Sequence, residues 1–327
     1  MSPAQTVRVR FHPPPEPLRR YFTTFYIVEW QVADGGTLTD YLMPEWANLR
    51  FHSGGVPEAE GLGGQRLSDT AFPVTGPSTQ AVRFTIGSTR MWGIGLMPLG
   101  WAKFVRASAS EYANAVIDGF TDPVFACFVP LAQSLFGDEP DEKAELERIC
   151  RHFLARVDEP VEEERRIIAI HEALIDPDVS TVAEMVARFG ASQRTVERTC
   201  ARAFGFSPKL LLRRQRFMRS LSHFMLDPSL NWIGAIDSHY HDQAQFVRDF
   251  HQFIGMAPRQ YAALPKPLIG AILRERARIA GSAVQTLDSP EGVSVSPGLR
   301  SGAFMPMERG LQQLDRSGLQ WFSRKCD

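Results

Sequence analysis

Apolar residues recur every three or four positions along much of residues 141–265, which is the periodicity of one helix face. The first stripe consists of Leu146, Ile149, Phe153 and Val157. Pro160 ends this run, and a second helix is predicted from about Val161 to Ile175, before Asp176 and Pro177. The first stripe packs either on its own chain or on a second copy as a dimer seam.

The chain before these helices follows a different pattern. From Val7 to about Phe120, short β-prone runs such as Tyr21–Val32 and Ala81–Ile86 alternate with turns rich in Gly and Pro. We expect a compact, mostly β domain that ends in the acidic stretch Gly137–Glu142. Its tryptophans are expected in the core or in a pocket wall: Trp30, Trp46, Trp92 and Trp101.

The strongest pattern is an internal repeat, because the segment from Phe189 onward aligns with itself after a shift of fifty positions. The aligned pairs are Ser192 with Asp242, Val196 with Phe246, Arg198 with Arg248, Gly205 with Gly255, Pro208 with Pro258 and Lys209 with Arg259. In both copies a capping residue opens a helix with a regular apolar stripe. The stripes are Val196, Cys200 and Ala203, then Phe246, Phe250 and Phe253.

A short helix is predicted before each capped helix, Val182–Phe189 in the first copy and Trp232 to about Ser238 in the second. Each capped helix ends at a glycine and then meets Ser207-Pro208 or Ala257-Pro258, which signals a new helix or turn. Helix, tight turn and capped helix, twice over, is the helix-turn-helix pattern.

One long helix is predicted between the copies, from Pro208 to Leu226. About 18 residues at roughly 1.5 Å each make it a spacer of roughly 27 Å. Major-groove faces recur about every 34 Å along a duplex, so the two units can enter adjacent grooves with some bending of the DNA.

Two sequence blocks carry a family resemblance. They are Gly190-Ala191-Ser192-x-Arg194-x-Val196-x-Arg198 with Gly205-Phe206-Ser207-Pro208-Lys209, and Tyr240-His241-Asp242-Gln243-Ala244-Gln245-Phe246-Val247-Arg248-Asp249-Phe250 with Gly255-Met256-x-Pro258. Over roughly residues 165–262 the chain resembles the DNA-binding domain of the AraC/XylS family of bacterial transcriptional regulators. The family usually has Gly in the second turn, where this chain has His239, so that turn is expected to differ in geometry.

The front half has a looser similarity to an N-terminal domain of some family members. The motifs are Leu42-Met43-Pro44-Glu45-Trp46-Ala47-Asn48-Leu49-Arg50-Phe51 and Gly93-Ile94-Gly95-Leu96-x-Pro98. This resemblance implies a sensing or oligomerising role and names no ligand.

Polar positions in the N-terminal half of each capped helix are left to face a groove. The predicted DNA-binding residues are Gln193, Arg194, Glu197 and Arg198 on the first recognition helix, and Gln243, Ala244, Gln245, Val247 and Arg248 on the second. Arg suits guanine edges and Gln suits adenine edges. The alternative is that these residues form solvated helix faces.

Phosphate contacts are expected from Ser192, Asp242, Arg213 and Arg216. The four arginines of the connecting helix cannot all face one way, because each residue turns the helix by 100°. They are Arg213, Arg214, Arg216 and Arg219. We therefore expect one or two of them at phosphate, and Arg213 equally well as the partner of a carboxylate such as Glu184 or Asp237.

The charge distribution supports this location of the DNA-binding residues. The net charge of the chain is −1, but residues 1–177 carry −8, residues 178–265 carry +4 and residues 266–327 carry +3. A basic central segment is what binding to phosphates requires. No run of about 18 apolar residues and no secretion signal is present, so we expect a cytoplasmic protein without a membrane partner.

Other chemistry finds little support in the sequence. The cysteines lie far apart, at Cys127, Cys150, Cys200 and Cys326, which argues against a disulfide framework and against the clustered zinc ligands of alkyl-transfer repair proteins. Asp242 is better used as a helix cap than with His239, His241, His251 and Asp249 as a metal ligand. His12 and His52 make no ligand cluster for a barrel enzyme, and G-x-S-x-G is absent. We expect no enzyme activity, metal or cofactor.

The sequence thus predicts an α+β fold, an N-terminal mostly β sensor-like domain followed by an all-α tandem helix-turn-helix domain. The predicted boundaries are 1–140 for the β domain, 141–160 for a helical linker, 161–265 for the tandem domain and 266–327 for a C-terminal extension. A short helix is expected near Leu268–Ile279, and much of 281–327 is expected to be mobile. The expected partner is double-stranded DNA, and RNA polymerase, a small-molecule effector and a second copy of the chain are further partners that the family resemblance leaves open.

Overall fold

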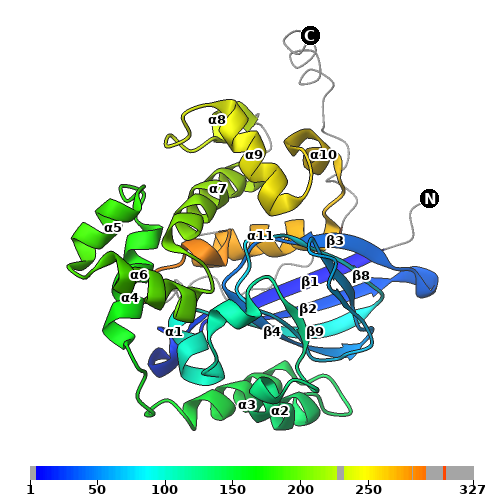
Figure 1. Ribbon diagram of the computed structural model, residues 1–327. Helices are drawn as coiled ribbons and strands as arrows, with labels where there is room; N and C mark the ends of the chain where they lie inside the picture. Colours follow the sequence, from blue (N-terminus) through cyan, green and yellow to red (C-terminus); the bar gives the residue numbers. More distant parts are fainter. Residues whose placement is uncertain (1–4, 227–231, 282, 292–304, 307–327) are drawn as a thin grey trace.

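Two antiparallel sheets form the N-terminal region of the computed structural model, which describes residues 5–226, 232–281, 283–291 and 305–306 (Figure 1). The larger sheet has the order β10-β7-β4-β9-β2-β1-β11 and the smaller one β3-β8-β5-β6. The larger sheet comprises β1 Gln5–His12, β2 Phe22–Val32, β4 Ala47–Gly54, β7 Pro73–Thr75, β9 Thr89–Leu96, β10 Val116–Asp118 and β11 Met305–Pro306. The smaller sheet comprises β3 Leu38–Leu42, β5 Glu58–Gly61, β6 Arg66–Leu67 and β8 Val82–Ile86.

The larger sheet is buried on both faces, and β4 shows how its sequence separates them. Leu49 and Phe51 point into one apolar core, whereas Asn48, Arg50 and His52 alternate with them and line a cavity on the opposite face. This confirms the expected mostly β region. It also explains why polar residues occur at buried positions of a central strand.

Helices cover the first face of the larger sheet. They are α1 Pro98–Gly100, α2 Val129–Ser134 and α3 Glu142–Leu154. On α3, Ile149 and Phe153 are fully buried, and the Phe153 ring lies 4.6 Å from the ring of Phe22. The apolar stripe of this helix therefore packs on its own chain, which was one of the two alternatives.

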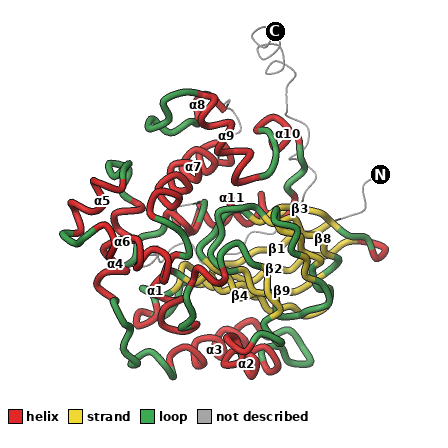
Figure 2. Tube along the Cα trace, in the orientation of Figure 1, coloured by secondary structure: helices red, strands yellow, loops and turns green. Residues whose placement is uncertain are grey.

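The remaining helices lie beside the strands in Figure 2 and share apolar cores with them. They are α4 Glu164–Ile175, α5 Val182–Phe189, α6 Gln193–Thr199, α7 Pro208–Leu226, α8 Trp232–Ala235, α9 Gln243–Ile254 and α10 Pro258–Ala263. The first of them, α4, packs on α1, α5 and α7. A π-helical turn, Cys200–Phe204, extends α6. The 19 residues of α7 connect the two helix-turn-helix units over about 28 Å.

The chain then returns to the β region through α11 Pro267–Ala280, which confirms the helix expected near Leu268–Ile279. α11 packs on β1, β3 and α7. The buried carboxylate of Asp40 on β3 accepts hydrogen bonds from the backbone N–H groups of Leu268 (3.0 Å) and Ile269 (2.9 Å), at the start of the helix.

The segment after α11 is partly buried. Ala283 is 0% and Val284 is 4% exposed, so this part is held in place by packing. The predicted mobility of the rest of the extension concerns residues 292–304 and 307–327, which lie outside the described residues.

Candidate nucleic-acid interface

The first helix-turn-helix unit has the caps that its sequence predicts. Thr181 and Glu184 form a reciprocal capping box at the start of α5, and Gly190 ends α5 with φ +64°. The Ser192 side chain then caps α6 by accepting from the N–H of Thr195 at 3.3 Å. Local sequence signals therefore set both ends of the turn.

The predicted residues of the first recognition helix all lie on its exposed side. Gln193, Arg194, Glu197 and Arg198 are exposed, whereas Val196 is fully buried. Gln193 donates to Glu197 at 2.8 Å, and Arg198 lies 3.3 Å from the carboxylate of Glu163. Arg194 forms no ion pair or hydrogen bond within the described part of the chain. The helix thus presents the guanidinium of Arg194 without a partner in the described chain, and that of Arg198, which is exposed and pairs with the mostly buried Glu163.

The second recognition helix, α9, repeats this arrangement with differences. Gln243, Ala244 and Arg248 are exposed, and Gln245 and Val247 are half-buried. Asp242 caps the helix by accepting from the N–H of Gln245 at 2.6 Å. The Gln245 side chain in turn accepts from the N–H of His241 at 3.3 Å, so it holds the helix start as well as facing outward.

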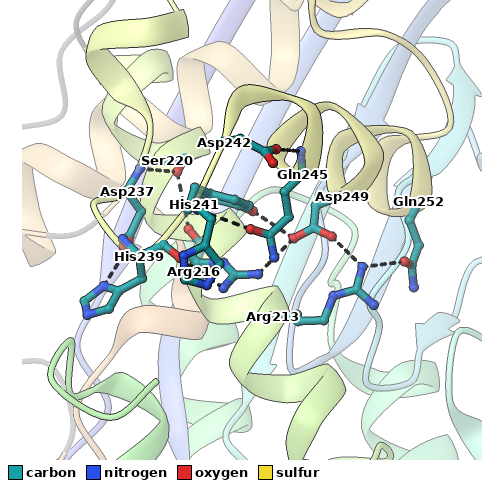
Figure 3. A network of polar contacts seen from close by, with 11 residues as sticks. Arg213, Arg216, Ser220, Asp237, His239, His241, Asp242, Gln245, Asp249 and Gln252 are labelled. Atoms are coloured by element: carbon teal, nitrogen blue, oxygen red, sulfur yellow. Dashed lines mark hydrogen bonds and ion pairs between the residues drawn. The ribbon is translucent and has the colours of Figure 1, made fainter. Parts of the chain in front are cut away.

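A buried carboxylate joins α9 to the connecting helix α7 (Figure 3). Asp249 is 1% exposed and is paired with both Arg213 and Arg216. The Tyr240 hydroxyl donates to Asp249 at 3.0 Å, and the Arg216 guanidinium lies 4.3 Å from the centre of the Tyr240 ring. Burial and the charge of Asp249 raise the pKa of Tyr240 well above its usual value, so the phenol keeps its proton.

This network determines what Arg213 and Arg216 can offer to DNA. Arg213 has an internal carboxylate partner, as one interpretation expected, but the partner is Asp249, and neither Glu184 nor Asp237. A phosphate contact by either arginine has to share a guanidinium that already donates to Asp249. Asp249 itself was missed as a structural residue, although it lies three positions after Phe246 on the apolar face of the helix, where a carboxylate needs a buried partner.

The second turn is built without glycine. His239 does not adopt positive φ; instead its N–H donates to the Asp237 carboxylate at 2.9 Å. Arg219 also pairs with Asp237, and the Asp237 N–H donates to the Ser220 hydroxyl at 2.8 Å. Although burial opposes ionisation, these hydrogen bonds lower the pKa of Asp237. The turn at His239 thus needs no left-handed residue, because the Asp237 carboxylate binds its backbone N–H.

The β region holds the connecting helix through Arg214, one of its four arginines, for which the sequence indicated no separate role. Its guanidinium is fully buried, stacks on Trp46 at 4.0 Å from the ring centre, and donates to the carbonyl of Ser78 at 3.0 Å. Burial lowers the pKa of Arg214 to about 9. The β region also reaches α9 directly, because the N–H of Ala81 donates to the carbonyl of Phe253 at 2.7 Å.

Two absences hold for the described residues. They contain no group of three or more His, Cys, Asp or Glu side chains placed to hold a metal ion. None of their helices has both the length and the apolar character needed to cross a membrane.

Comparison with known protein families identifies the same part of the chain. Residues 185–263 match a protein family described as a helix-turn-helix domain, which confirms the prediction made from the repeat. No curated protein matches the chain.

Similar solved structures include ToxT from Vibrio cholerae. A P21 crystal form has 10% identity and a TM-score of 0.39, and the alignment covers 79% of this chain and 98% of that one. Wild-type ToxT of strain SCE256 with a bound unsaturated fatty acid has 11% identity and a TM-score of 0.37, with 79% and 95% covered.

Proposed function

We propose that this chain, which carries a helix-turn-helix domain of the AraC type over residues 185–263, is a sequence-specific transcriptional regulator that places α6 and α9 in adjacent major grooves of one duplex. The observation that supports this most directly is the repeat in three dimensions. Each capped helix buries an apolar stripe and exposes a polar N-terminal half, and one rigid helix of 19 residues separates the two.

The exposed side chains suit this role. Arg194 and Arg248 are exposed and form no ion pair or hydrogen bond within the described residues, so each recognition helix offers a guanidinium that DNA can take up without breaking an internal contact. Gln193 and Gln243 offer amides suited to adenine. Arg198 is itself exposed and can exchange Glu163 for a phosphate, because Glu163 keeps Arg166 and Thr199 as partners.

The other predicted contact residues support the recognition helices. They are Ser192, Asp242, Arg213 and Arg216. Ser192 and Asp242 hold the helix N-termini, where free N–H groups attract a phosphate, and Asp242 contributes through the backbone because its side chain is an anion. Arg213 and Arg216 orient α9 through Asp249 and add positive potential near the backbone of the DNA.

We further propose that the β region modulates DNA binding. It contacts the connecting helix at Arg214 and the second recognition helix at Phe253, so a change in the β region acts on the positions of both units. We also propose that the protein acts by binding DNA and does not catalyse a reaction. RNA polymerase and a second copy of the chain stay predicted partners.

The test is selection of bound sequences from a random duplex pool, followed by fluorescence anisotropy at several salt concentrations. We expect an enriched site with two short half-motifs about one helical turn apart. The double variant Arg194→Ala, Gln243→Ala should lose about 30-fold or more in affinity for that site and keep its salt-dependent affinity for random DNA.

Arg66→Ala is the matched control, because Arg66 is an exposed arginine of the β region paired only with Glu60 in the described chain. It should bind like the parent. Absence of any enriched sequence, together with equal binding by the double variant, would contradict the proposed recognition residues.

A further inference from the structure

A cavity of about 130 Å³ lies between the two sheets. Its walls are mostly apolar side chains from both sheets, among them Tyr26, Val28, Phe84 and Met91. Its size is close to that of an engineered apolar cavity of roughly 150 Å³ that binds benzene. The cavity therefore has room for one small molecule.

Glycines keep this space open on β9. A Cβ at Gly93 would lie 2.0 Å from the ring of Tyr26, and a Cβ at Gly95 would lie 2.7 Å from the side-chain oxygen of Gln285. The strand therefore has no side chains at the two positions where they would displace residues of the cavity wall.

The C-terminal segment, residues 267–281 and 283–288, completes the wall. Leu268, Ile269 and Ile272 of α11 line the cavity, and Val284 and Gln285 line it beyond the helix. The cavity is therefore formed by parts of the chain that lie on both sides of the helix-turn-helix domain in sequence.

The charges around the cavity are matched. Arg50 donates to both oxygens of Glu45 at 2.9 Å, and Arg276 is paired with the buried carboxylate of Asp288. Although burial alone would lower the pKa of Arg50, the charge of Glu45 raises it, so the guanidinium stays charged. An anionic ligand would have to break one of these pairs, which is unfavourable in a buried site.

One buried polar atom in the wall has no partner. His52 is 8% exposed and lines the cavity; its Nδ1 lies 3.2 Å from the Thr89 hydroxyl, while its Nε2 has no hydrogen-bond partner in the described structure. Burial, and next to it the charge of Arg50, lowers the pKa of His52 to about 3 against the smaller opposing effect of the Gly55 backbone, so the ring is neutral. It offers one hydrogen bond to an uncharged group.

We propose that this cavity binds a small, uncharged, mostly apolar molecule with a single hydrogen-bonding group near His52, and that binding stabilises the docked C-terminal segment. The coupling runs through two contacts. Gln285 donates to Glu45 at 2.7 Å, and Gln215 of α7 donates to the carbonyl of Thr286 at 2.6 Å. An occupant of the cavity therefore strengthens a connection between the β region and the helix that joins the two DNA-binding units.

The biological meaning of this inference rests on the proposed function, but the binding itself is measured without DNA, so the two can fail separately. The probes for isothermal titration calorimetry at neutral pH are 3-methylphenol, toluene and benzoate. We expect saturable binding of one 3-methylphenol per chain and binding of benzoate at least about tenfold weaker. Benzoate binding as tightly as 3-methylphenol, or no binding of 3-methylphenol, would overturn the ligand class.

Matched variants locate the site. Ile272→Trp fills the cavity and should weaken 3-methylphenol at least about tenfold, whereas Arg274→Trp adds the same ring at an exposed position of α11 and should bind like the parent. His52→Leu should weaken 3-methylphenol and leave toluene unchanged. Unchanged binding of 3-methylphenol by Ile272→Trp, or equal losses of both probes in His52→Leu, would place the ligand elsewhere.

Hydrogen exchange of the unmodified chain tests the coupling and needs no variant to fold. With 3-methylphenol bound, amide exchange over residues 268–288 should slow, while exchange in α5 should not change. If the ligand binds and exchange in the C-terminal segment stays the same, the coupling is wrong even though the site is right.

Discussion

Asp249 is the residue on which both α7 and α9 depend in the second helix-turn-helix unit. Two arginines and a tyrosine donate to one carboxylate that is 1% exposed. The sequence alone left Arg213 open between a phosphate contact and an internal pair with Glu184 or Asp237. It could not indicate Asp249, because the partner is determined by how α7 crosses α9.

Asp249→Ala should lower the free energy of unfolding by about 3 kcal/mol, because it leaves the positive charges of Arg213 and Arg216 without their carboxylate. Chemical denaturation with fluorescence detection measures this. Glu172→Ala removes an exposed carboxylate of α4 and should change stability by less than about 0.5 kcal/mol. Equal small effects of the two substitutions would show that the network is not structural.

His171 makes stability sensitive to acid. It is 1% exposed and lies against Trp46 and Phe204; burial, and next the charge of Arg214, lowers its pKa to about 3. The unfolded chain binds a proton near pH 6.5 and the folded chain does not, so this contribution is complete above pH 6.5 and is lost as the pH falls toward 3.

The free energy of unfolding should therefore depend less on pH in His171→Phe. Its slope should be smaller by about 1.4 kcal/mol per pH unit between pH 6 and about 4. Denaturation midpoints measured across this range test the slope. His223→Gln, at an exposed position of α7, should keep the slope of the parent. A parallel pair of curves for parent and His171→Phe would refute the assignment.

The elements follow the sequence most closely where local signals set their ends. α5 and α7 begin and end as predicted, because a capping box, a proline and a glycine act within a few residues. The first recognition helix continues into a π-helical turn that no local signal indicated, and α8 ends at Ala235, before the predicted Ser238. In the first unit the turn uses the positive φ of Gly190, whereas in the second unit the Asp237 carboxylate accepts a hydrogen bond from the backbone N–H of His239.

The glycines that end the two helices of the first unit, Gly190 after α5 and Gly205 after the π-helical turn of α6, differ in their surroundings. Gly190 has φ +64° and open space at the Cβ position, so Gly190→Ala should cost about 1 kcal/mol through backbone strain alone, and Gly190→Asn should cost less. Gly205 has φ +84°, and a Cβ there would lie 3.1 Å from the carbonyl of Ala109.

Gly205→Ala should therefore cost about 2–3 kcal/mol, and asparagine should not rescue this position. Thermal denaturation of the four variants provides the comparison. Identical losses at Gly190 and Gly205 would mean that the contact with the β region is absent in solution.

At the scale of the whole molecule, the β region and the C-terminal segment enclose the connecting helix. The sequence predicted a β region, a helical region and the family of the helical region, but it did not predict how the two pack together. Arg214, Trp46 and Gln285 are far apart in the chain, and no periodicity or spacing relates them. Only the folded structure shows that the arginine-rich helix turns one arginine into the core and two toward Asp249.

Arg214→Met should loosen this connection, because the carbonyl of Ser78 loses its donor and Trp46 loses its cation. Amide exchange should rise about tenfold or more in residues 77–81 and 208–215 together. Arg219→Met, which breaks the pair with Asp237, should raise exchange in the second unit only. If amide exchange in Arg214→Met rises only in α7, the β region is not coupled to the helix-turn-helix units.

The most direct test of the central claim is a hydroxyl-radical footprint of the full chain on its selected duplex, with the mass of the complex measured in parallel. Two helix-turn-helix units on one rigid connecting helix predict two protected patches on the same side of the DNA, about 10 base pairs apart, in a complex that contains one chain. A single protected patch per chain, with two patches appearing only when two chains are bound, would contradict the claim that one chain reads two adjacent grooves.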